Sequence, residues 1–181
     1  MQAFFLNKRN AVILTAVIVV ISIFSGAVRS LNKMRNDAVL TFENGALRDG
    51  VSVANDIKRR ANLAWDMALI AEKYIGETDT TKKMKEFIDK FEKEKDIANK
   101  FKISSDIAKA ASELYSAIDK QILTDELHLK KWSDIYTELA KENTIKNDKY
   151  NNEAFVFNQK LNKLPARLIK RLGLIEELPV Y

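Results

Sequence analysis

Residues 11–28 read AVILTAVIVVISIFSGAV and determine the first element of the fold. These 18 positions contain no charged residue. A helix rises about 1.5 Å per residue, so the stretch spans roughly 27 Å, close to the thickness of the hydrocarbon core of a bilayer. The sequence therefore predicts one transmembrane helix over residues 11–28, preceded by a short N-terminal tail, residues 1–10.

Charge is distributed unevenly around this stretch. The chain has 30 Lys and Arg against 25 Asp and Glu, a net charge of +5, and the first 35 residues hold the whole excess. A nucleic-acid-binding domain needs cations clustered on its folded surface, so this distribution argues against nucleic acid as a partner. We expect the basic residues around the apolar stretch to contact the headgroups of anionic lipids instead. These residues are Lys8, Arg9, Arg29, Lys33 and Arg35.

Two interpretations of the apolar stretch are open. As a retained anchor, it makes the chain a single-pass protein of the cell membrane. A basic start, an apolar run and the small residues Ser25-Gly26-Ala27 also describe a signal peptide, cleaved after Ala27 to release an exported protein. Basic residues on both sides of the stretch leave the orientation undetermined. Ser22 and Gly26 have the spacing that lets two membrane helices pack closely, so a homo-oligomer is also open.

The remainder of the chain has the composition of a helical protein. The whole sequence contains 5 Gly and 2 Pro, far fewer than turn-rich β architectures need. Residues 40–75 carry a heptad-like seam made mostly of small residues, typical of a coiled coil whose partner helices approach closely. The positions of the seam are Leu40, Leu47, Gly50, Ala54, Ile57, Ala61, Ala64, Ala68, Ala71 and Ile75.

Turn and capping residues divide the chain into three long arms, residues 31–75, 81–122 and 126–164. A turn is expected at 76–80, and the apolar stripe of the second arm loses phase near 103–106. Short connections make neighbouring arms antiparallel. We therefore predict an all-α fold: an elongated antiparallel up-down-up bundle of three arms over residues 31–164, preceded by one transmembrane helix.

Residues 165–181 form a short basic amphipathic segment after Pro165. Arg167, Lys170 and Arg171 alternate there with apolar residues. An odd number of arms places this segment at the end of the bundle far from the anchor. We therefore expect its apolar face to pack onto the tip of the bundle.

The sequence contains no recognisable catalytic or ligand-binding motif. It has no Cys and a single His, which excludes thiolate sites and sites with several histidines. Nucleophile, phosphate-binding and metalloprotease motifs are missing as well. We expect no enzymatic activity, no cofactor and no metal site, and we interpret His128 as a structural residue.

Two motifs resemble the LemA family. YNNEAFVFNQKLNKLP at 150–165 matches a Tyr-Asn pair followed one heptad later by an aromatic-Asn pair and then by Pro. IKRRANLAWDM at 57–67 resembles the family's hydrophobic-Lys-Arg-Arg motif, with Asn62 where the family has Asp and Trp65 where it has Pro. The resemblance implies a divergent member, a membrane-anchored antiparallel helical bundle and a retained anchor. It implies no biochemical activity.

These observations predict a scaffold or protein-interaction module with an unknown protein partner. The alternative is a sensor-like bundle that binds a small ligand in a cleft lined by Asn151 and Asn158, whose spacing also suits a register-setting role. The candidate interaction surface is taken from the two motifs. Its residues are Lys58, Arg59, Arg60, Tyr150, Asn151, Phe157 and Asn158.

Overall fold

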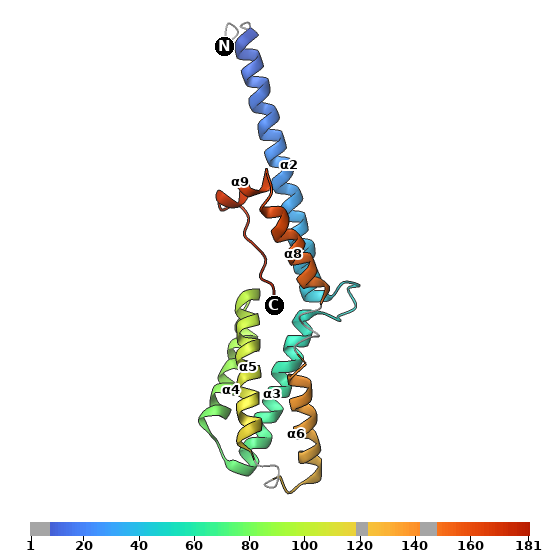
Figure 1. Ribbon diagram of the computed structural model, residues 1–181, viewed down its shortest axis with the longest axis vertical. Coiled ribbons are helices and arrows are strands. Elements are labelled where there is room, and N and C mark those ends of the chain that lie inside the picture. Colours follow the sequence, from blue (N-terminus) through green and yellow to red (C-terminus); the bar gives the residue numbers. More distant parts are fainter. Residues whose placement is uncertain (1–7, 119–122, 142–147) are drawn as a thin grey trace. The chain divides into compact units, whose positions relative to one another are not determined.

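The computed structural model describes residues 8–118, 123–141 and 148–181, and over these residues the protein is all-α. This confirms the predicted fold class. Most of the predicted tail, residues 1–7, lies outside the described residues. The helices are α2 (Lys8–Asn44), α3 (Val53–Ile75), α4 (Asp79–Lys93), α5 (Ile97–Ala117), α6 (Glu126–Leu139), α8 (Lys149–Leu161) and α9 (Ala166–Arg171) (Figure 1).

Contacts divide the chain into two compact units, each of which is described separately. Among the described residues, unit 1 comprises 8–39 and 153–178, and unit 2 comprises 40–152 and 179–181. The predicted bundle, residues 31–164, is therefore shared between the two units.

The first predicted arm is not one helix. α2 continues without a break from the apolar stretch to Asn44, and α3 begins only at Val53. Gly45 has a φ of 80°, and a Cβ there would lie 2.0 Å from the carbonyl oxygen of Val51, so the turn excludes any side chain. Ser52 then caps α3: its hydroxyl accepts from the backbone N–H of Asn55 and donates to the carbonyl of Glu43. The seam residues Leu47 and Gly50 thus lie in a loop.

The second predicted arm reverses direction. Its interruption is at 94–96 rather than 103–106, because Asp96 caps α5 and α5 then runs unbroken to Ala117. α4 and α5 pack side by side, as Figure 1 shows, instead of forming one collinear arm. Three residues cannot separate two helix ends widely, so the helices form an antiparallel pair. Unit 2 is therefore built around four antiparallel helices: α3, α4, α5 and α6.

The core of unit 2 places small residues of α3 against large residues of the other helices. Four alanines of the predicted seam in α3 are at most 2% exposed, while Ala54 in its first turn is half-buried. Met84 of α4, Leu114 of α5 and Trp132 of α6 are also buried. Alanine side chains leave room for these larger ones. The buried alanines are Ala61, Ala64, Ala68 and Ala71.

The core of unit 2 has four helices where three arms were predicted, and this changes the end of the core at which the chain leaves it. An even number of antiparallel helices returns the chain to the end at which it entered. Accordingly, Leu139 at the end of α6 lies beside Arg60 in the second turn of α3, and the ring centroids of Phe42 and Tyr150 are 5.2 Å apart. The expectation that the C-terminal segment packs onto a distal bundle tip is therefore wrong: residues 153–178 belong to the same unit as residues 8–39.

In unit 1, α8 runs back along α2 and ends in α9 (Figure 1). The Nζ of Lys160 lies 3.7 Å from the Sδ of Met34. Residues 12–23 of α2 are exposed on every side, whereas Leu31 and Ala38 are buried. α2 is long and apolar enough to cross a membrane, with a mean hydropathy of 2.7 over its most apolar 18 residues. A signal sequence near the N-terminus meets the same criteria of length and composition.

Candidate functional site

In unit 2, the last three residues of the sequence lie against side chains from three helices. We call this group the Arg60 cluster; it comprises Arg60 of α3, Phe101 of α5, and Tyr150 and Asn151 of α8. The ring of Phe101 meets the ring of Tyr181 edge to face, with centroids 5.0 Å apart. The cluster thus brings together the two motifs that the sequence analysis singled out, although about 90 residues separate them in the chain.

Arg60 is buried, with 6% of its surface exposed. One guanidinium nitrogen, Nη1, donates to the hydroxyl of Tyr181 over 3.1 Å, and Nη2 donates to the carbonyl of Leu139 over 2.5 Å. Its Nε atom has no hydrogen-bond partner among the described residues. A buried guanidinium is costly unless hydrogen bonds replace its hydration, so these two contacts hold Arg60 in place rather than present it to a partner.

Tyr150 and Asn151 bind the backbone of the same terminal residues. The hydroxyl of Tyr150 donates to the carbonyl of Pro179 over 2.7 Å, and the side-chain oxygen of Asn151 accepts from the backbone N–H of Tyr181 over 2.9 Å. Tyr150 is fully buried and Asn151 is 6% exposed. These side chains therefore fix the position of residues 179–181, a structural role for the Asn that the sequence left open.

Asp56 lies near the Arg60 cluster and carries a perturbed carboxyl group. Desolvation by burial raises the pKa of Asp56 above its usual 3.8, and the negative charge of Asp148 raises it further. The positive charges of Arg59 and Arg60 oppose this shift. Burial and the like charge of Asp148 thus outweigh the two guanidinium groups at this carboxyl.

Phe157 and Asn158 lie on α8 in unit 1. Phe157 is fully buried. Asn158 pairs with the backbone of Leu178 in both directions: its side-chain nitrogen donates to the carbonyl over 2.7 Å, and its oxygen accepts from the N–H over 2.9 Å. An amide side chain that pairs in this way replaces one residue of a β-ladder and holds the extended segment before Leu178 in place.

Only two residues of the predicted interaction surface are exposed, Lys58 and Arg59. Arg59 forms an ion pair with Glu138 of α6, with a distance of 3.1 Å between Nη2 and Oε2. The side chain of Arg59 is 66% exposed, so the pair contributes little to stability. A neighbouring ion pair between Lys131 and Asp66 also joins α6 to α3.

A shallow hollow lies beside the Arg59–Glu138 ion pair on this same face. It lies between α3 and α6, and its rim combines apolar and charged side chains. Leu127 lines this hollow and is 72% exposed. The lining residues are Leu63, Leu127, Lys130, Lys131, Asp134, Ile135 and Glu138.

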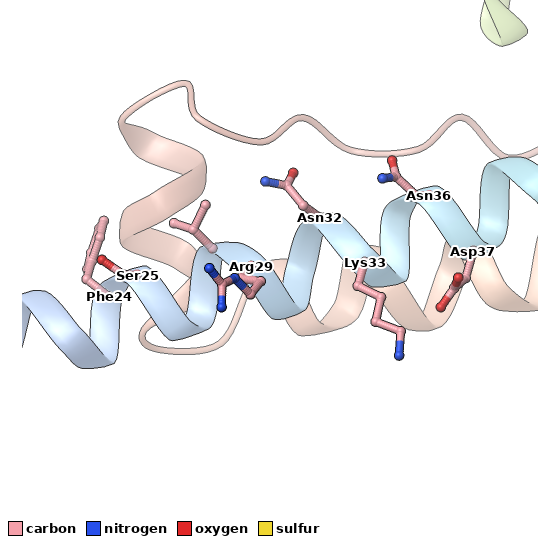
Figure 2. A pocket seen from close by; sticks show the side chains of 8 residues that line it. Phe24, Ser25, Arg29, Asn32, Lys33, Asn36 and Asp37 are labelled. Carbon is pink, nitrogen blue, oxygen red and sulfur yellow. The ribbon is translucent and has the colours of Figure 1, made fainter.

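The residues predicted to contact headgroups are divided between the two ends of the apolar segment of α2 in unit 1. Lys8 and Arg9 are exposed at its start; Arg29 and Lys33 are exposed beyond it, and Arg35 is half-buried. Figure 2 shows Arg29, Lys33 and their neighbours along a shallow hollow on one face of α2. Its lining residues are Phe24, Ser25, Val28, Arg29, Asn32, Lys33, Asn36 and Asp37.

His128 of α6 contacts α3 and the cap of its own helix. Its Nδ1 lies 2.8 Å from the hydroxyl of Tyr74 in α3 and 3.7 Å from a carboxylate oxygen of Asp125, the N-cap of α6. Within residues 8–118, 123–141 and 148–181, no group of three or more His, Cys, Asp and Glu side chains is placed to hold a metal ion.

No family model, curated protein or solved structure matches this chain. The resemblance to the LemA family therefore stays a prediction that rests on the two motifs. The sequence analysis singled out Arg60, Tyr150 and Asn151 as part of an interaction surface, and it missed Pro179 and Tyr181, to which their side chains bind. A terminal Tyr in an apolar context carries no pattern that identifies its partners.

Proposed function

We propose that the protein is a single-pass membrane protein, as the LemA resemblance also implies, and that its helical part is a protein-interaction module. The observation that supports anchoring is the exposure of residues 12–23 of α2 on every side. Apolar surface that encircles a helix matches a lipid environment, whereas a helix buried in a protein core has its apolar residues covered. The two basic ends of this segment match the headgroup regions.

Anchoring is tested on the full chain in its native cells. Alkaline carbonate extraction should leave the protein in the membrane fraction, and the mature protein should keep residues 11–28 by intact mass. A mature mass that begins after Ala27 would show that the segment is a cleaved signal peptide. Protease protection of intact cells then gives the side on which the helical part lies.

The interaction module is supported by the α3–α6 face of unit 2. This face combines the exposed Arg59 with an exposed Leu127 beside a shallow hollow, and Lys58 is exposed next to Arg59 in the sequence. Apolar side chains within a charged rim are the usual composition of a transient protein interface. Arg60 is not part of this surface, because it is buried against Tyr181.

The test is a charge reversal confined to the exposed residues, Lys58→Glu with Arg59→Glu. Crosslinking in intact cells should recover fewer partners with this variant, while helical circular dichroism is unchanged. A matched control reverses two exposed lysines of α4, Lys83→Glu with Lys93→Glu. Equal partner recovery from the reversed α3 variant and the wild type would contradict the assignment.

A further inference from the structure

The turn around α9 exposes leucines in a way that the helical core does not require. Ile169 and Ala166 of α9 are buried and account for its packing within unit 1. The remaining apolar residues face outward: Leu164 is 74% exposed, Leu168 45%, Leu172 66% and Leu174 56%. We call residues 164–174 the leucine turn. Four large exposed apolar residues within eleven positions form a patch that a water-soluble surface seldom presents.

Two of these leucines share one side of α9. Leu168 lies in α9 and Leu172 is its C-cap, and a separation of four residues keeps their side chains on one face of the helix. Leu164 lies in the turn just before α9. Arg167 and Arg171 are exposed between them. Exposed leucines alternating with arginines are typical of segments that lie at a membrane surface, where leucines enter the acyl region and arginines contact phosphates.

Unit 1 places the leucine turn at one end of the apolar segment of α2. Residues 12–23 of α2 are exposed on every side, and Phe24 is the first residue after them that is half-buried. Figure 2 shows α9 beside Phe24, Ser25 and Arg29, and Figure 1 shows α9 beside α2. If residues 11–28 cross a bilayer, α9 therefore lies at the height of its headgroups, close to the exposed Arg29 and Lys33.

We propose that the leucine turn is a second membrane contact, which lies in the interface of the same bilayer that α2 crosses. Leu164, Leu168 and Leu172 enter the boundary of the acyl chains. Arg167 and Arg171, together with Arg29 and Lys33 of α2, contact the phosphates of anionic lipids. Lys170 is less available, because it forms an ion pair with Glu177. This inference rests on the proposed membrane anchoring of α2.

The contact would make the end of unit 1 that bears α9 a platform on the membrane surface rather than a single flexible point of attachment. A helix that leaves a bilayer alone can tilt and rotate freely. A second contact, offset from the axis of that helix, restricts both motions. The orientation of α8, which leads into α9, would then be defined with respect to the membrane.

Single cysteine labels test the proposal, because the natural chain contains no cysteine. Full-length Leu168→Cys is labelled with an environment-sensitive fluorophore and reconstituted in nanodiscs of phosphatidylcholine and phosphatidylserine. Its emission should shift to shorter wavelength, and lipids that carry a shallow spin label should quench it. The same label at Leu127→Cys, an exposed leucine on α6, should show water-like emission and escape quenching.

A third label separates failure of this inference from failure of the anchoring itself. Ile18→Cys lies in the middle of the apolar segment and should be quenched by deep spin labels. If the label at Ile18 is quenched and that at Leu168 is not, the leucine turn does not contact lipid and the proposal is overturned, while anchoring stands. If neither label is quenched, anchoring itself fails. A blue shift at Leu168 without lipid quenching would show that protein covers the turn, which also overturns the proposal.

The charge component has its own variant. Arg167→Gln with Arg171→Gln keeps the leucines and removes the two cations, so quenching at Leu168 should decrease on membranes with phosphatidylserine. On pure phosphatidylcholine, the variant and the parent should be quenched equally. Loss of quenching that is the same on both membranes would contradict a role for anionic lipid.

Discussion

The apolar segment of α2 and the helix α3 are both rich in apolar residues, but they use them in opposite ways. In α2, valine and isoleucine cover residues 12–23 on all sides and remain exposed. In α3, alanines occupy one face and are buried, while Arg59 and Asn62 lie on the exposed side. The comparison shows that apolar content alone does not define the environment of a helix. The size of the apolar residues and their distribution around the helix axis do.

The largest expected effect comes from placing charge on the encircled surface of α2. Ile18→Lys with Val19→Lys should remove the protein from the membrane fraction, since each lysine near the centre of a membrane helix costs about 3 kcal/mol. The check is carbonate extraction and fractionation. Leu69→Lys, at an exposed leucine of α3, is the matched control and should leave membrane association unchanged. If the double variant stayed in the membrane fraction, the proposal that residues 12–23 of α2 face lipid while α3 faces protein would be contradicted.

The second effect is measured by replacing one alanine with leucine in each of the two helices. Ala68 is fully buried in α3, so Ala68→Leu must displace the packed neighbours of α4 to α6 and should lower the stability of unit 2 by about 1–3 kcal/mol. Ala16 is exposed in α2, and Ala16→Leu should leave stability unchanged. Thermal unfolding of the full chain in detergent, followed by circular dichroism, measures both. Equal unfolding temperatures for the two variants would contradict the packing argument.

This contrast also explains how much of the fold the sequence predicts. Residues 11–28 and the alanines of α3 were recognisable because both depend on local composition and period. The reversal at 94–96 was missed: the sequence favoured a break at Ile103–Asp106, where Ser104 and Ser105 resemble caps. In the structure Ser104 is buried within α5, so a tertiary contact overrides the local signal.

The loop between α2 and α3 was missed for a related reason. Leu47 and Gly50 continue the heptad spacing, which favoured one helix. Gly45, Gly50 and the potential cap at Ser52 were contrary signals, and the structure uses all three. A heptad pattern can continue across a loop by chance. Glycine positions are therefore better evidence for a helix end than the continued spacing is.

The candidate site was predictable only in part. The spacing of Asn151 and Asn158 correctly placed both residues on the apolar side of one helix. Their binding to the backbone of Tyr181 and Leu178 depends on pairing over 20 to 30 residues, which no local pattern reports. The sequence therefore identifies polar residues on the apolar side of a helix, but it does not identify the backbone groups to which their side chains bind.

The third effect is the loss of stability that follows removal of the N-cap of α3. Ser52 is buried, and its hydroxyl joins the end of α2 to the start of α3 through Glu43 and Asn55. Ser52→Ala removes both hydrogen bonds and should cost about 1 kcal/mol in the stability of unit 2. Ser116→Ala is the control, because that exposed hydroxyl only donates to Ser112 within α5. The free energy of unfolding in urea compares the two variants, and an equal loss in both would show that Ser52 is not a specific cap.

The smallest effect is a dependence on acid that unit 2 should show and the apolar part of α2 should not. The backbone N–H of His128, with a second one from Leu127, holds the pKa of Asp125 below its usual 3.8. A carboxyl whose pKa is lower in the folded protein adds stability above pH 4, which is lost as the pH falls through its folded pKa. Residues 8–36 contain no Asp or Glu, so this segment has no carboxylate to titrate.

Asp56 provides the opposite sign within the same unit. Desolvation by burial raises its pKa, so its contribution to stability is present at low pH and is lost as the pH rises from 3.8 through the folded pKa. Between pH 3 and 6, Asp125→Asn should flatten the rise of the unfolding temperature with pH, and Asp56→Asn should steepen it. If the unfolding temperature rose with the same slope against pH in both variants, the pKa values of Asp125 and Asp56 would not be shifted in opposite directions. Opposite changes would instead show that Asp125 and Asp56 make the stability of the four-helix unit depend on pH with opposite signs.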